Sequence, residues 1–325
     1  MVIKTVAMLL MYLIPSILLC FGLIPSPLIA MLLYVLGGLG IAGIGMGIMH
    51  DANHGSYTKD SKVAYLLGHT LDLMGCSSEM WKLQHNVLHH TYTNVHGHDE
   101  DISAPLFLLR FSPHSKRYPI HKFQYLYVWF FYSILTLYWV TVKDFRKAGD
   151  YLNKGLILSK GEYRKRLVKL SFLKLGYFTY ALVLPMIFAP FSIWWILLGF
   201  VVMHLIAGLL LSVVFQLAHV VPDMDFPQPD EEDYIDSNWN IHQLQTTSNF
   251  STNNPLLIWY FGGLTHQIEH HLFPNICHVH YKRIGKIVER TAKDFNLPYN
   301  VNNTFYTAVS GHVKILRQLG TMNTI

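Results

Sequence analysis

Four long apolar runs constrain the fold of this chain more than any other feature of its sequence. They cover residues 4–24, 28–49, 171–190 and 192–218. A helix of about 20 predominantly apolar residues is long enough to cross a lipid bilayer. The composition agrees, because 51% of the residues are hydrophobic and only 14% are charged. The sequence therefore predicts an all-α integral membrane protein with four transmembrane helices.

Short uncharged links join these runs in pairs and predict two helical hairpins. The letters IPSP join the first pair, and APFS joins the second. Links this short return each pair to the side of the membrane that it left. The first run is interpreted as a transmembrane helix and not as a cleaved leader, because a second run follows without a small-residue cleavage site. The sequence leaves open whether further residues precede Met1 in the full protein.

Two more apolar segments lie between the hairpins. Residues 63–76 are too short to span a bilayer, which favours a re-entrant or interfacial helix. Residues 122–142 are long enough, but Tyr and Trp run along the whole segment instead of gathering at its ends. Residues 143–169 carry nine Lys or Arg, which the positive-inside tendency places in the cytosol. We therefore place 122–142 in the plane of the interface; the alternative is that it crosses together with 63–76.

This topology predicts one domain over residues 1–325, in which interfacial helices and a cytosolic helical cap complete the two hairpins. The cap consists of residues 50–170 and 219–325. The formal net charge of +5 suggests a cytosolic surface that meets anionic lipid or an acidic partner. No motif supports nucleic-acid binding. The three cysteines are widely spaced and predict neither a disulfide framework nor a thiolate metal site.

Three histidine clusters follow the predicted membrane boundaries: HDANH at 50–54, HNVLHH at 85–90 and HQIEHH at 266–271. Residues four apart lie on one face of a helix, so His50 pairs with His54 and His85 pairs with His89. His90 lies rotated beside the second pair. Imidazole is a good ligand for iron, zinc, copper and nickel, and each pair offers two nitrogens to one ion.

The third cluster allows two registers. The four-residue spacing pairs Gln267 with His271, and equally pairs His266 with His270. His219 ends the fourth apolar run and reaches the same cytosolic side, so we include it as a ligand. His204, near the middle of the same run, is interpreted as a packed or hydrogen-bonded residue.

The number of candidate ligands indicates two metal ions. They are His50, His54, His85, His89, His90, His219, His270 and His271, with Gln267 or His266. Eight or nine ligands exceed what one tetrahedral zinc needs and suit two ions of five or six coordination. Iron is the natural choice, because two irons can activate dioxygen and remove hydrogen from an unactivated C–H bond. Lone histidines elsewhere are interpreted as satisfied polar residues: His69, His114, His121, His278, His280 and His312.

The three clusters, their order and the hairpins between them resemble the membrane fatty acid desaturase family. The glutamine in HQIEHHLFP resembles the front-end desaturases, which insert a double bond between an existing one and the carboxyl end of the acyl chain. The resemblance covers nearly the whole chain. It implies di-iron ligands at His50, His54, His85, His89, His90, His219, Gln267, His270 and His271. Spacing alone keeps His266 as the alternative to Gln267.

The resemblance also implies cofactors and partners. We expect two iron ions, dioxygen as co-substrate, and an acyl-CoA or acyl-lipid substrate in membrane lipid that acquires a cis double bond. No haem-binding HPGG signature occurs, so we expect a separate electron donor of ferredoxin or cytochrome type. The basic segment 143–169 is a candidate docking surface for this donor or for phosphates of the acyl carrier.

Residues near the clusters are expected to orient the ligand rings, because metal-bound histidines usually donate their second N–H to an oxygen acceptor. The candidates are Asp51, Asp99, Asp101, Trp239, His242, Thr246, Asn249 and Glu269. For Glu269, the alternative to orienting a ligand ring is that its side chain faces solvent.

Other functions are compatible with parts of this pattern. A hydroxylase or ketolase on the same scaffold would retain oxygen in its product. A membrane zinc hydrolase would work without dioxygen. A metal transporter is disfavoured, because the histidines gather at helix ends on one face and do not continue through the bilayer.

Overall fold

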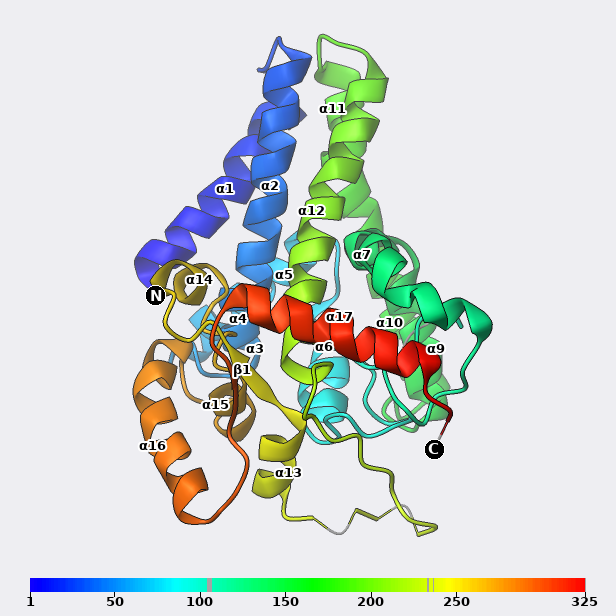
Figure 1. The fold of residues 1–325 in the computed structure, drawn as a ribbon. Coiled ribbons are helices and arrows are strands. Elements are labelled where there is room, and N and C mark those ends of the chain that lie inside the picture. The colour runs from blue at the N-terminus through cyan, green and yellow to red at the C-terminus, as the bar shows by residue number, and fades with distance from the viewer. Residues whose placement is uncertain (104–106, 233, 236, 325) are drawn as a thin grey trace. The chain divides into compact units, whose positions relative to one another are not determined.

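The computed structural model describes residues 1–103, 107–232, 234–235 and 237–324. Within these residues the regular secondary structure is helical apart from two short strands, and loops connect the elements (Figure 1). The chain forms two compact units. The first unit consists of residues 1–53, 58–81 and 131–212, and the second of residues 54–57, 82–130 and 213–325.

Among the longer helices described, α7 (Gln124–Ser133) and α12 (Ile193–His219) run from one unit into the other. The other elements of the first unit are α1 (Val2–Cys20), α2 (Pro27–Gly47), α3 (Met49–Asn53), α4 (Ser61–Gly68), α5 (Thr70–Leu73), α6 (Ser78–Lys82), α8 (Leu135–Tyr138), the π-turn η3 (Trp139–Lys143), α9 (Asp144–Asn153), α10 (Lys160–Phe178), the π-turn η4 (Thr179–Val183) and α11 (Leu184–Phe188).

In the described part of the chain, four helical stretches are long and apolar enough to cross a membrane, as predicted: Val2–Cys20, Pro27–Asn53, Lys160–Phe188 and Ile193–His219. The turn between the first two rests on Gly22, whose φ of +62° suits a residue without a Cβ. Pro27 then opens α2 at a position where a backbone N–H is not needed. These features produce the first hairpin that the letters IPSP predict.

Glycines let the helices of the first unit approach one another closely. A Cβ on Gly38 would lie 2.5 Å from the carbonyl oxygen of Met203 in α12. A Cβ on Gly40 would lie 2.8 Å from the backbone nitrogen of Tyr12 in α1. Small residues at such contacts are the usual basis of helix packing in membranes, where lipid is as apolar as the side chains.

The helix that contains the third apolar run begins before that run. Hydropathy placed its start at residue 171, whereas α10 begins at Lys160, where the Ser159 hydroxyl accepts a hydrogen bond from the N–H of Glu162 over 3.1 Å. Long charged side chains are good helix formers, so the helix extends through the polar stretch that hydropathy cannot detect. The basic segment 143–169 is largely helical, because η3, α9 and the start of α10 cover most of it.

The two intermediate apolar segments are broken. Residues 63–76 form the short helices α4 and α5, which are too short to span a bilayer. The segment around 122–142 consists of Pro119–Ser133 and Leu135–Asn153, bent by 53° at the break between them. Such a bend fits either a broken span or a re-entrant loop, so the placement of this segment in the interface stays a prediction.

A buried ion pair ties three parts of the first unit together. Nζ of Lys174 in α10 lies 2.6 Å from the carboxylate of Asp144 and donates to the carbonyl oxygens of Gly75 (2.6 Å) and Trp139 (2.9 Å). The indole N–H of Trp139 and the backbone N–H of Ser77 also donate to the Asp144 carboxylate. Both charges are thus satisfied by hydrogen bonds, which is the condition for burying them.

The second unit carries most of the histidines. Its elements are the π-turn η1 (Leu83–His89), the 3₁₀ turns η2 (Pro119–Phe123) and η5 (His278–His280), α13 (Trp239–Thr246), α14 (Pro255–Tyr260), α15 (Gln267–Leu272), α16 (Tyr281–Asp294) and α17 (Phe305–Thr321). Strand β1 (Ser248–Phe250) pairs in parallel with β2 (Asn300–Asn302), with Asn249 opposite Val301. This pairing brings the chain after α16 back beside the segment that leads to α15.

Candidate metal centre

The second histidine cluster lies on a π-helical turn. The backbone N–H of His90 donates to the carbonyl oxygen of His85 over 3.0 Å, a closure of five residues. The wider turn rotates His90 toward the face that carries His85, and their Nε2 atoms lie 3.3 Å apart. The turn is π-helical where the sequence analysis assumed an α-helix, although the rings of His85 and His89 still stack, with centroids 5.2 Å apart. π-Helical turns are rare in proteins, and those that occur are often found at functional sites.

One group of rings contains a member from each histidine cluster. Ring nitrogens of His54, His85 and His270 lie within 4.8 Å of one another. The ring centroids of His54 and His270 are 4.9 Å apart, nearly perpendicular to each other. His50 is a buried residue of α3 in the first unit, four positions before His54 in the chain, and its Nδ1 lies 3.8 Å from the carboxylate of Asp51.

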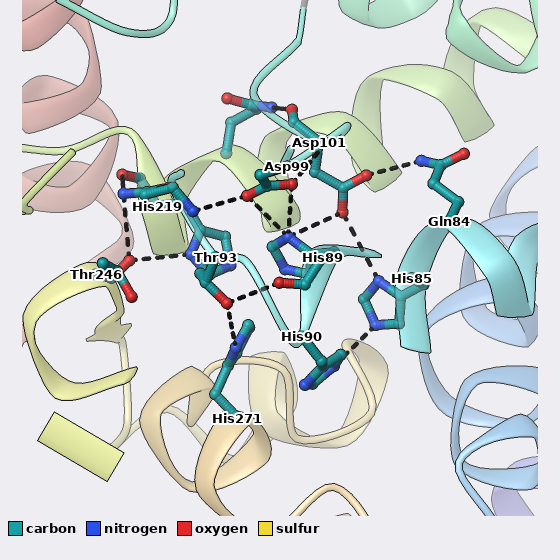
Figure 2. A network of polar contacts seen from close by, with 12 residues as sticks. Gln84, His85, His89, His90, Thr93, Asp99, Asp101, His219, Thr246 and His271 are labelled. Carbon is teal, nitrogen blue, oxygen red and sulfur yellow. Dashed lines mark hydrogen bonds and ion pairs between the residues drawn. The ribbon is translucent and has the colours of Figure 1, made fainter. Parts of the chain in front are cut away.

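A second group lies in the same unit and takes one member from each of three elements. Ring nitrogens of His89, His219 and His271 lie within 4.8 Å of one another. Figure 2 shows these rings approaching from η1, from the end of α12 and from α15. His219 is the last residue of α12, so the fourth apolar run ends where the sequence analysis expected a ligand.

Each ring of this second group has its Nδ1 directed at an oxygen acceptor: His89 at the Asp99 carboxylate (3.0 Å), His219 at the Thr246 carbonyl (3.1 Å) and His271 at the Gln243 amide oxygen (2.9 Å). In the neutral form of each ring, these bonds assign the N–H to Nδ1 and leave a lone pair on Nε2. Among the residues that the structure describes, Nε2 of His219 and of His271 is buried and has no hydrogen-bond partner. Rings oriented by outer oxygens with an open second nitrogen are typical of metal ligands.

His90 lies between the two groups. Its ring stacks on His271 with centroids 4.4 Å apart, and its ring nitrogens lie within 4.8 Å of those of His270 and His271. Burial and the neighbouring imidazoles hold the pKa of His90 well below its usual value, and they do the same for His271. Both rings therefore stay neutral, which is the form that binds a metal.

Two carboxylates act on His89. Burial by itself would lower its pKa, but Asp99 and Asp101 outweigh burial and raise the pKa of His89 to about 9. Burial opposes ionisation of Asp101, yet His89 and the other donors hold its pKa below the usual range. Gln84 is one of these donors, at 2.7 Å (Figure 2). These two carboxylates make His89 a more basic ligand than an isolated imidazole.

The helix that carries the third cluster is fixed from outside. Oδ1 of Asn249 accepts the backbone N–H of Ile268 at 2.9 Å, and its amide donates to Glu269 at 2.9 Å. The Tyr299 hydroxyl donates to the other oxygen of Glu269 at 2.8 Å. Burial raises the pKa of Glu269, and the residue is not exposed to solvent, contrary to the alternative considered from the sequence.

Three residues that sequence reasoning missed hold the centre together. The Thr93 hydroxyl lies 3.3 Å from Nδ1 of His271 and donates to Gln243 at 3.0 Å. Asn94 adopts a φ of +60°, and its amide donates to the carbonyls of His219 and Thr246. The sequence offered only a weak signal for these residues. Thr93 and Asn94 are polar and follow the second cluster closely, and asparagine tolerates a left-handed backbone conformation.

The expected orienting residues divide into two sets. Asp99, Asp101 and Thr246 face the rings, whereas Trp239 and His242 bind backbone carbonyls of His90 and Thr93. Several isolated histidines bond to oxygens away from the centre, as expected: His69, His114, His121, His204 and His312. The three cysteines are free thiols.

The two candidates at the head of α15 differ in their surroundings. Gln267 opens the helix, is buried, and within the described residues its side-chain nitrogen has no hydrogen-bond partner. His266 precedes the helix, and its Nδ1 lies 3.0 Å from the Thr265 hydroxyl. In the described part of the chain, His266 belongs to no group of three potential ligand atoms within 4.8 Å.

The residues present fit metal ions. The donor set consists of buried imidazoles, the rings of the second group are oriented by oxygen acceptors, and in the described residues Nε2 of His219 and of His271 is open. Imidazole nitrogen suits iron as well as zinc or copper. Buried polar atoms are normally satisfied, so open nitrogens converging in one place indicate a bound cation. Fold and centre together define a helical membrane protein with a histidine-rich site suited to metal.

Comparison with known proteins identifies the family. Residues 25–303 match the sequence model of the fatty acid desaturase family. The chain is 36% identical to the sn-1 linoleoyl-lipid 6-desaturase of Synechocystis sp., over 87% of this chain and 78% of that protein. It is 37% identical to the enzyme of the same name from Arthrospira platensis, over 87% and 76%. It is 38% identical to the acyl-lipid (8-3)-desaturase of Physcomitrium patens, over 91% of this chain and 61% of that protein.

The chain belongs to the fatty acid desaturase family. It is an oxidoreductase that desaturates fatty acyl chains, as the histidine clusters predict. Enzymes of this family generally use a di-iron centre, and the histidine groups described above are consistent with one.

Proposed function

We propose that this chain is a front-end desaturase of acyl-lipids that introduces a cis double bond at a di-iron centre. The observation that carries the proposal is the pair of adjoining imidazole groups, one of which has every Nδ1 held by an oxygen acceptor. The names of the relatives support the substrate, because those from Synechocystis, Arthrospira and Physcomitrium are all named as lipid-linked desaturases.

We assign the ligands from these groups. One iron would be held by His54, His85 and His270, with His50 supplied from four residues earlier in the chain. The other would be held by His89, His219 and His271. His90 and Gln267 complete the set. Gln267 is preferred to His266 because, among the described residues, His266 belongs to no group of three potential ligand atoms.

Bound iron would supply the dioxygen chemistry that removes two hydrogens from adjacent acyl carbons. One turnover reduces one dioxygen to two waters, which takes two electrons and two protons in addition to those from the acyl chain. The residues of this chain orient the ligands through Asp99, Thr246 and Gln243. The burial of these residues excludes bulk water from the centre. The acyl carbon that reacts is selected by its position in the bound chain and not by chemical activation.

We further propose one desaturase domain over residues 1–325, since the family match runs from 25 to 303. The four long helices support a multi-pass arrangement with the histidines on the cytosolic face. The electron donor lies outside these 325 residues, which contain no HPGG signature.

The test is the fatty acid profile of cells that are fed linoleate and express the wild-type chain, His89→Ala or the exposed control His280→Ala. We expect a new double bond on the carboxyl side of the existing ones in the wild type and the control, and none in His89→Ala. Mass spectrometry locates the bond. A product that retains label from ¹⁸O₂ would instead identify a hydroxylase and overturn the proposal.

A further inference from the structure

Helix α16 presents a row of exposed cations directly after the third histidine cluster. They are Lys282, Arg283, Lys286, Arg290 and Lys293. Among the described residues none of the five forms an ion pair within 4.0 Å. The helix itself carries only Glu289 and Asp294 as acids. The result is an excess of positive charge on one solvent-facing surface, which we call the α16 face.

The basic segment 143–169, expected from the sequence to dock a partner, is less available. Arg166 pairs with Glu162 at 2.7 Å and with Glu79 at 3.4 Å. Lys169 pairs with the same Glu79 at 2.6 Å, and Lys147 lies 3.8 Å from an aspartate in α9. Part of this charge is therefore already neutralised within the first unit.

The α16 face lies close to the metal centre. Figure 1 shows α16 beside α15, and the hydroxyl of Tyr281, the first residue of α16, lies 3.3 Å from Nδ1 of His270. A Cβ on Gly285 would lie 3.2 Å from the Glu269 carboxylate, so the backbone of α16 packs closely against this side chain of α15. The helix that bears the cations thus directly contacts a proposed ligand.

Apolar side chains accompany the cations. Ile287 in the middle of α16 is 58% exposed, and Phe295 just after its end is 73% exposed. A small apolar centre surrounded by charged residues is the usual composition of a protein docking surface. An electron donor has the strongest reason to bind here, because electron transfer requires its redox group to come near the metal centre.

We propose that the α16 face docks an acidic one-electron carrier protein that delivers the two electrons of each turnover. This inference rests on the proposed desaturase function. The carrier gives up one electron in each of two encounters, and the acceptor is the metal centre with its dioxygen. Carboxylates on the carrier pair with the lysines and arginines, so attraction accelerates the encounter and weakens as salt is added.

The experiment compares two triple charge reversals in purified full-length enzyme. Lys282→Glu/Lys286→Glu/Arg290→Glu alters the α16 face. Lys160→Glu/Arg164→Glu/Lys165→Glu makes the same change of net charge at exposed positions of α10. Turnover is measured with an acidic plant-type ferredoxin or the soluble domain of cytochrome b5, and separately with reduced methyl viologen, a small mediator that needs no protein surface.

For the α16 variant, we expect the KM for the protein carrier that drives wild-type turnover to rise by roughly 10-fold or more at low salt. The α10 control should keep the wild-type KM, and both variants should keep wild-type turnover with methyl viologen. Equal losses in both variants, or an unchanged KM in the α16 variant, would overturn the proposal. So would a loss that persists with methyl viologen, which would indicate a role toward lipid or substrate.

Failure of the desaturase function itself has a different signature. In that case the wild-type enzyme forms no unsaturated product with any donor, including methyl viologen. If methyl viologen supports wild-type turnover and neither acidic carrier does, the function stands and the docking proposal is overturned.

Discussion

The carboxylate of Asp99 accepts a hydrogen bond from Nδ1 of His89 over 3.0 Å. This bond turns the opposite ring nitrogen toward His219 and His271, the other two members of the second histidine group. The same carboxylate accepts the backbone N–H of Asn94 at 2.8 Å. His89 and Asp99 are each only 1% exposed, so neither exchanges this contact for water. Orientation of the ligand is thus built into the protein.

Replacing this carboxylate tests its electrostatic role. In Asp99→Asn the side chain keeps an oxygen that accepts from His89 but loses its charge. We expect the affinity for iron to fall by about 10–100-fold. Iron retained against a series of chelator concentrations measures this effect, and the exposed substitution Asp294→Asn serves as the control. Wild-type iron affinity in a folded Asp99→Asn protein would contradict the role assigned here.

The amide of Gln243 has a comparable role toward His271. In Gln243→Leu the Nδ1 of His271 loses its 2.9 Å acceptor, and the ring is free to adopt the other tautomer. We expect roughly a 10-fold loss of iron affinity or of turnover. The matched control is Gln245→Leu, on the same helix and less buried. If both substitutions have equal effects, the loss reflects packing of α13 and not ring orientation.

The head of α15 provides a direct choice between two ligands. We expect Gln267→Ala to reduce bound iron or alter its spectroscopic environment, because it removes a proposed ligand. His266→Ala should retain the wild-type iron content, since His266 lies outside the ligand groups in the described residues. Iron analysis and ⁵⁷Fe Mössbauer spectra of both proteins decide between them. The reverse pattern would assign the ligand to His266.

Sequence alone predicted the helical membrane class, the histidine clusters and the family, because hydropathy and four-residue spacings are local properties. It did not predict the π-turn that brings His90 to His85, since the five-residue closure is not distinguished by residue type. It also missed Gln243, whose role depends on a contact 28 positions away in the chain. The start of α10 at Lys160 was missed because hydropathy ignores the helix propensity of charged residues.

The buried ion pair of the first unit should matter for stability. In Lys174→Met the Asp144 carboxylate stays buried without a cation, which we expect to cost about 3–5 kcal/mol of unfolding free energy. The double variant Lys174→Met/Asp144→Leu leaves no uncompensated charge and should lose less. Thermal unfolding in detergent compares the two. A double variant less stable than the single one would show that the other hydrogen bonds of Asp144 dominate.

The most direct test of the central claim is the metal content of the purified protein. Enzyme expressed in ⁵⁷Fe medium is analysed for iron per chain and by Mössbauer spectroscopy, beside His89→Ala. The account predicts two irons per wild-type chain in an imidazole-rich environment, with iron lost from the variant. One iron per chain, or stoichiometric zinc in protein that forms unsaturated product, would contradict it.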